Sequence, residues 1–172
     1  MTHADNLLEG IRKEITICKQ LFKKLPDGAL PFKPAENMRS TEELLRYLLI
    51  AGGAMLRFFG MEQNRDNMKA SFGHYKEKLS GSEIVDFPKL MDDQMHDIEE
   101  FFKNISDEDL LTKQIMMPWG EFMALERGII EGPIKWLTAY KMQLFLYAKL
   151  AGNSKINTGD CWVGSEPEAI AG

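Results

Sequence analysis

The sequence contains few of the residues that carry redox, metal or nucleophilic chemistry. Its 172 residues include only two cysteines and three histidines. It has no CxxC pair, and no glycine-rich phosphate loop follows a strand. Cys18 occupies an apolar position of a helical pattern and Cys161 stands near the C-terminal end, so we expect free thiols rather than a disulfide framework. Neither Cys18 nor any histidine falls in a motif of nucleophilic catalysis.

A long apolar run and an excess of positive charge are also missing. No uninterrupted apolar segment approaches the roughly 20 residues that a membrane-spanning helix needs. The first five residues show neither the basic start nor the apolar run of a signal peptide. The net charge is −5 with scattered lysines and arginines, which leaves no electrostatic footprint for nucleic acid or an anionic membrane. We therefore expect a cytoplasmic protein without a nucleic-acid or membrane partner.

Helical patterns account for most of the chain, which is of a length typical of one domain over residues 1–172. Apolar residues recur at helical spacing, with no convincing strand alternation, in four segments. These segments are 5–24, 40–60, 86–105 and 122–151. The pattern predicts an all-α four-helix bundle.

Several local signals refine these segments. Ser40 and Glu43 form a capping box that starts the second helix. Gly52-Gly53 costs roughly 1 kcal/mol per residue relative to alanine, so close packing or room for a ligand should compensate. We expect a kink or restart of the last helix at Gly132-Pro133. Residues 61–81 are expected to form a polar connection with a broken helical turn, and residues 153–172 an irregular tail docked by Ile156 and Trp162.

The last helix has an unusually polar and aromatic inner face. A helical wheel places Glu131, Lys135, Lys149 and, less centrally, Lys141 toward solvent. The opposite, inward face carries Trp136, Tyr140, Gln143 and Tyr147. One interpretation is a set of large core residues whose polar groups find internal partners. The other is a pocket between helices, lined by aromatic side chains and a few polar groups.

Four short segments in this region resemble a family signature. Gly132-Pro133, Tyr140-Lys141-Met142-Gln143, Gly152-Asn153 and Cys161-Trp162-Val163-Gly164 are similar to the Gly-Pro, His-x-Gly-Gln, Gly-Asn and aromatic-x-Gly elements of the DinB-like (YfiT-like) four-helix-bundle superfamily. The resemblance implies a DinB/YfiT-like bundle, a stress-associated role and a homodimer. It covers the helix order over most of the chain, while its specific motifs lie between Gly132 and Gly164.

The same resemblance implies that a metal site has been lost. In this superfamily three imidazoles, one from the second helix and two from the last, typically hold a divalent metal that activates a water or a thiol. The corresponding places here are Tyr47, in Leu44-Leu45-Arg46-Tyr47, together with Trp136 and Tyr140. Indole has no accessible lone pair and a phenol is protonated near pH 7, so neither replaces imidazole. We therefore expect no metal, no other cofactor and no metal-dependent catalysis.

The three histidines that are present do not rebuild a metal site. His3 lies at the terminus, His74 in the polar connection and His96 on the third helix. Asp92 and His96 share a helix face at four-residue spacing, but two ligands without a third are a weak signal. The acidic residues around them are most simply a solvated surface.

Three functional hypotheses remain open at this point. The first is a metal-free protein with a small-molecule pocket lined by Tyr47, Trp136, Tyr140, Gln143 and Tyr147. The second, implied by the resemblance, is a metal- or thiol-dependent transferase or isomerase. The third is a dimeric interaction module. We expect a homodimer partly because the second helix carries a second apolar face. This face comprises Leu45, Leu49, Gly52, Leu56 and Phe59.

Overall fold

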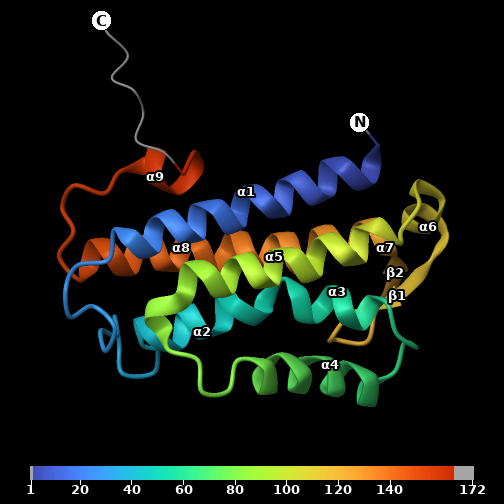
Figure 1. Cartoon of the computed structure of the whole chain (residues 1–172), viewed down its shortest axis with the longest axis horizontal. Helices are drawn as coiled ribbons and strands as arrows, with labels where there is room; N and C mark the ends of the chain where they lie inside the picture. The colour runs from blue at the N-terminus through green and yellow to red at the C-terminus, as the bar shows by residue number, and fades with distance from the viewer. Residues whose placement is uncertain (1, 165–172) are drawn as a thin grey trace, which may run out of the picture.

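The computed structural model describes residues 2–164 and confirms the all-α class. Helix α1 contacts both α5 and α8, and α2 contacts the same two helices, so these helices pack side by side around one core (Figure 1). The long helices are α1 (His3–Lys23), α2 (Thr41–Ala51), α3 (Gly53–Phe59), α4 (Arg65–Lys78), α5 (Phe87–Lys103) and α8 (Lys135–Leu150). The shorter ones are η1 (Ile84–Asp86), α6 (Asp107–Thr112), α7 (Leu125–Ile129), η2 (Ile130–Ile134) and α9 (Thr158–Trp162).

A local capping signal starts α2 where the sequence predicts it. The main-chain N–H of Glu43 donates to Ser40 Oγ at 3.1 Å, and that of Ser40 donates to Glu43 Oε2 at 2.6 Å. The predicted capping box at α2 is therefore confirmed. Thr2 and Asp5 form a second box at α1. Each box satisfies amide groups that have no partner within the helix.

The second predicted helix is divided at Gly52, between α2 and α3, and Gln94 of α5 bridges the division. Its Oε1 atom accepts from the N–H groups of Gly52 and Gly53 at 3.0 and 2.9 Å, and its Nε2 atom donates to Leu48 O at 3.1 Å. A Cβ at Gly53 would lie 2.2 Å from the hydroxyl oxygen of Tyr75. Close packing, rather than room for a ligand, therefore explains the glycine pair.

The segment 61–81 contains a fourteen-residue helix, α4, where the sequence analysis expects a mostly irregular connection. Asn64 caps it by accepting from Asn67 N at 2.8 Å. Its polar composition hides a narrow inner stripe of Met68, Phe72 and Tyr75, which pack on the rest of the core. Tertiary packing, which composition does not report, stabilises this helix. Figure 1 shows α4 lying along the outer side of α2 and α3.

Two further expectations need correction. Residues Phe122–Ala124 form strand β2, not the start of the last helix, and pair antiparallel with β1 (Gln114–Met116). Strands of three residues are too short to show alternation. In the tail, residues 158–162 form α9 and Ile156 is buried as predicted, but Trp162 is 59% exposed. Residues 165–172 of the predicted tail lie outside the described part of the chain.

The predicted irregularity at Gly132-Pro133 is confirmed as the π-helical segment η2, between α7 and α8. Proline has no N–H to donate within a helix, and a wider π turn is one way to accommodate it. Within residues 2–164, no helix combines the length and the apolar composition needed to cross a bilayer.

The second apolar face of residues 40–60 is covered within the chain. Its members Leu45, Leu49, Leu56 and Phe59 are at most 1% exposed. Helix α4 packs on α2 and α3, and η2 packs on α3. The inference that this face needs a second copy of the chain was therefore wrong.

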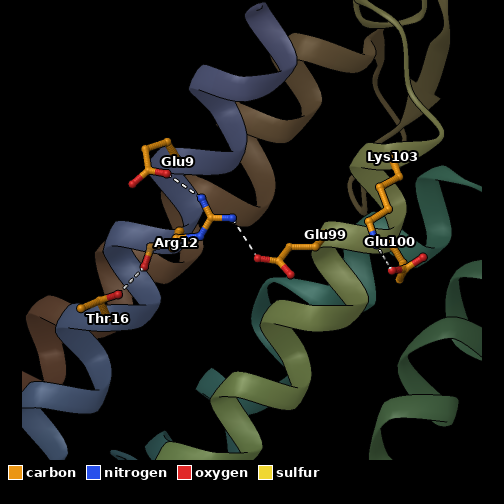
Figure 2. Close-up of polar contacts among 6 residues, drawn as sticks. All are labelled: Glu9, Arg12, Thr16, Glu99, Glu100 and Lys103. Carbon is orange, nitrogen blue, oxygen red and sulfur yellow. Dashed lines mark hydrogen bonds and ion pairs between the residues drawn. The ribbon is translucent and has the colours of Figure 1, made fainter. Parts of the chain in front are cut away.

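Charged side chains connect the outer edges of α1 and α5. Arg12 donates to Glu99 Oε1 on α5 at 2.8 Å and to Glu9 Oε2 on its own helix at 2.6 Å (Figure 2). The hydrogen bonds that Arg12 donates to Glu99 and, to a smaller extent, to Glu9 raise the pKa of Arg12. Part of the acidic face of α5 is thus matched to bases on its neighbours.

Candidate functional site

Two of the places that the resemblance assigns to metal ligands meet in the structure. The rings of Tyr47 on α2 and Tyr140 on α8 have centroids 4.6 Å apart in an edge arrangement. Arg39, in the loop before α2, lies over both, with its Cζ atom 4.7 Å from the Tyr47 centroid and 5.7 Å from that of Tyr140. A guanidinium over an aromatic face is attracted by the ring quadrupole. The cluster is therefore a cation on a pair of phenols.

Tyr147 supports this cluster from one side. It is 2% exposed, and its hydroxyl donates to the main-chain oxygen of Arg39 at 3.1 Å. Its ring also packs edge-on against Phe32, at a centroid distance of 6.1 Å. The capping box of Ser40 fixes the residue that follows Arg39, and the Tyr147 hydroxyl binds the carbonyl oxygen of Arg39 itself. Tyr147 thus acts as a core residue that anchors the loop carrying Arg39.

The phenol of Tyr47 stays protonated at neutral pH. Burial, followed by the neighbouring charge and hydrogen bond of Tyr140, raises the pKa of Tyr47 to about 12. Burial also raises the pKa of Tyr147. We expected Tyr140 to be mostly buried against Trp136 or the second helix; it is half-buried, with its ring on Tyr47 of α2.

Trp136 lies beside α4, which the sequence analysis does not predict as a helix. It packs on Phe72 of α4 at a centroid distance of 6.5 Å. Gln143 is half-buried on the same helix, one turn beyond Tyr140. Sequence reasoning missed Arg39 and Phe72. The sequence offers one indication for Arg39, its position directly before the Ser40 cap of the second helix. It offers none for Phe72, which lies in a segment that was not expected to pack on the core.

A cavity of about 240 Å³ opens beside Tyr47, between α2 and α4. Its floor consists of Leu49, Ile50 and Leu79, and its polar wall consists of Glu43, Arg46 and Lys76, with Tyr47 completing the lining. A second cavity of about 490 Å³ shares Glu43 and Arg46 and continues toward Leu30 and Lys33. Of the five predicted pocket residues, only Tyr47 lines either of these two cavities.

The residues at the places that the resemblance assigns to metal ligands do not fit a metal. Tyr47 and Tyr140 are phenols, Trp136 offers no lone pair, and the Arg39 guanidinium puts a positive charge over the rings. Among residues 2–164, no three His, Cys, Asp or Glu side chains come together as a metal site requires.

The histidines and their neighbours have other contacts. His3 Nδ1 lies 3.0 Å from Glu126 Oε1, and the hydrogen bond and charge of Glu126 raise the pKa of His3. Asp92, which shares a helix face with His96, pairs with Lys19 of α1.

Lys141 is not on the solvent side, where the helical wheel placed it. It is 1% exposed, and its Nζ atom lies 2.8 Å from Glu14 Oε2 on α1. Helix α9 packs on α1 and α8 and brings the Trp162 ring to 5.5 Å from the same Nζ atom. The free thiols of Cys18 and Cys161 are buried nearby, and burial raises the pKa of each. High thiol pKa values make both cysteines poor nucleophiles.

No known family model matches the sequence, and no curated protein matches it either. A search of solved structures finds the crystal structure of a DinB-like protein, YjoA, from Bacillus subtilis. The match has a TM-score of 0.66 at 14% sequence identity and covers 88% of this chain and 95% of that one. At this identity the similarity establishes the fold and leaves the function open. The chain has a DinB-like fold.

Proposed function

We propose that this chain is a metal-independent binding protein for a small organic molecule, with its site in the α2–α4 cavity beside Tyr47. The observation that carries the proposal is the position of this cavity. It opens at a half-buried aromatic ring, and that ring belongs to the Arg39–Tyr47–Tyr140 cluster, at the place where the resemblance puts metal ligands. Its volume is close to the lower end of the range for ligand pockets, about 300 Å³.

The lining favours binding over catalysis. Leu49, Ile50 and Leu79 provide an apolar floor, and a few polar groups stand around it, as is usual for small-molecule sites. A general acid or base works best with a pKa near the operating pH. The Tyr47 pKa is about 12, and the hydrogen bond from Ser40 N and the charge of Lys33 lower the pKa of Glu43. Neither group suits proton transfer near pH 7.

Three of the other predicted pocket residues, Tyr140, Tyr147 and Trp136, support the site from outside the cavity in this proposal. Tyr140 packs on Tyr47, and Tyr147 holds the loop of Arg39. Trp136 supports α4 through Phe72. A ligand would therefore contact Tyr47, while these three residues fix the positions of the Tyr47 ring and of α4.

A cavity-filling variant tests the proposal. Leu79→Trp places a large side chain at a half-buried position of the cavity wall, and Leu150→Trp makes the same change at an exposed position on α8. Small aromatic and aliphatic compounds would be titrated into each ¹⁵N-labelled protein. We expect shifts in α2 and α4 amides for the wild type and for Leu150→Trp, and none for Leu79→Trp. Binding that survives in Leu79→Trp, or shifts confined to other helices, would overturn the proposal.

A further inference from the structure

The two adjoining cavities carry a local positive charge on an acidic protein. Lys33, Arg46 and Lys76 line them together with Glu42 and Glu43, and Arg39 adds a fourth cation at the Tyr47 ring. Four cations against two carboxylates leave a local charge of +2, whereas the whole chain has a net charge of −5.

Among the residues that the structure describes, only two of the four cations at these cavities lie close to a carboxylate. Arg46 Nη2 lies 2.9 Å from Glu42 Oε1, so these two groups are paired. Glu43 accepts from Ser40 N and lies 3.7 Å from Lys33 Nζ, so its charge faces the helix cap and Lys33. In the described part of the chain, neither Arg39 nor Lys76 forms an ion pair. The uncompensated charge therefore rests on Arg39 and Lys76.

Lys76 lines the same cavity as the apolar residues Leu49, Ile50 and Leu79. It lies in the last turn of α4, and the cavity wall continues to Leu79, one turn further along. Leu49 and Ile50 of α2, which are at most 7% exposed, form the rest of the apolar floor. A ligand on this floor would thus meet aliphatic carbon and one phenol ring along its length, and a free ammonium at its end.

We propose that this cavity binds an organic monoanion with a flat apolar body, such as a one- or two-ring aromatic carboxylate. The inference rests on the proposed function and adds the ligand class. The carboxylate pairs with Lys76, the ring lies between Tyr47 and the aliphatic floor, and Arg39 contributes attraction from behind the Tyr47 ring. A charged acceptor makes a stronger hydrogen bond than a neutral one of the same shape.

Three matched probes separate charge from shape: naphthalene-2-carboxylate, naphthalene-2-methanol and trimethyl(naphthalen-2-ylmethyl)ammonium. Calorimetric titration of the full chain at low salt should give about tenfold tighter binding of the carboxylate than of the alcohol. The ammonium probe should bind most weakly. Added salt should reduce the preference for the carboxylate, because exposed charges are screened.

Lys76→Gln and Lys69→Gln provide the matched variants. Both lysines are exposed on α4, but only Lys76 lines the cavity. Lys76→Gln should weaken carboxylate binding about fivefold and leave alcohol binding unchanged. Lys69→Gln should change neither.

The outcomes distinguish this inference from the proposed function. If none of the probes binds, both fail. If carboxylate and alcohol bind equally and Leu79→Trp blocks both, the proposed function stands and the anion preference is wrong. A stronger response to the ammonium probe, or a carboxylate preference that Lys76→Gln leaves intact, also overturns the assignment.

Discussion

Gln94→Leu should lower the free energy of unfolding by about 3 to 5 kcal/mol, because it removes the partner of three buried main-chain groups. Gln94 is 2% exposed and serves the N–H groups of Gly52 and Gly53 and the C=O of Leu48. Each such group costs roughly 1 to 3 kcal/mol when it is left unpaired. Leucine is similar in size, so the cavity contribution is small.

The expected loss lies toward the lower end of the summed cost for the three unpaired groups, because one main-chain hydrogen bond of the helix can form in their place. An uninterrupted α-helix would join Leu48 O to Gly52 N directly, and a small shift could restore this bond. Even so, 3 to 5 kcal/mol is a large part of the roughly 5 to 15 kcal/mol that stabilises a typical domain.

Urea denaturation followed by far-UV circular dichroism measures the effect. Met95→Leu, a buried substitution on the same helix with no polar contact to lose, should cost less than about 1.5 kcal/mol. Amide exchange at Gly52 and Gly53 should accelerate in Gln94→Leu more than in Met95→Leu. A Gln94→Leu protein as stable as Met95→Leu, with protected Gly52 and Gly53 amides, would refute the bridging role.

Three other predictions follow from single contacts. Gly53→Ala should destabilise the protein by about 1 to 3 kcal/mol through its clash with Tyr75, and the penalty should shrink in a Tyr75→Ala background; additive effects in this double-mutant cycle would argue against the clash. In an NMR titration His3 should have a pKa above 6.5, and Glu126→Gln should lower it. The His3 contact therefore stabilises the fold below pH 6.5 and is lost as the pH rises through the folded-state pKa, and an unshifted His3 would contradict this. The purified protein should contain no stoichiometric zinc or nickel by elemental analysis, because the protonated phenol of Tyr47 is a poor ligand for either metal. Stoichiometric metal that is lost on Tyr47→Ala would contradict this prediction.

Short-range chemistry was readable from the sequence. The capping box of Ser40 and Glu43 involves groups three residues apart, and the irregularity at Pro133 follows from a missing N–H, so neither depends on the rest of the fold. The inner stripe of the last helix also placed Tyr140 and Tyr147 on the side facing other helices. The DinB-like fold was recognised from the same region and is supported by the structural match.

Long-range packing decided the rest. Helix α4 forms because the narrow stripe of Phe72 and Tyr75 finds a surface on α2, α3 and Trp136, which its own composition does not indicate. Lys141 is buried because α9 covers that side of α8 and Glu14 on α1 supplies a countercharge. A helical wheel describes one helix in isolation and cannot include either contact. The cavity beside Tyr47 likewise exists only where α4 meets α2. Local sequence determines where helices begin and break, because the hydrogen bonds at helix ends span only a few residues. The tertiary structure alone determines which helix faces are buried or line a cavity, because burial depends on segments far apart in the chain.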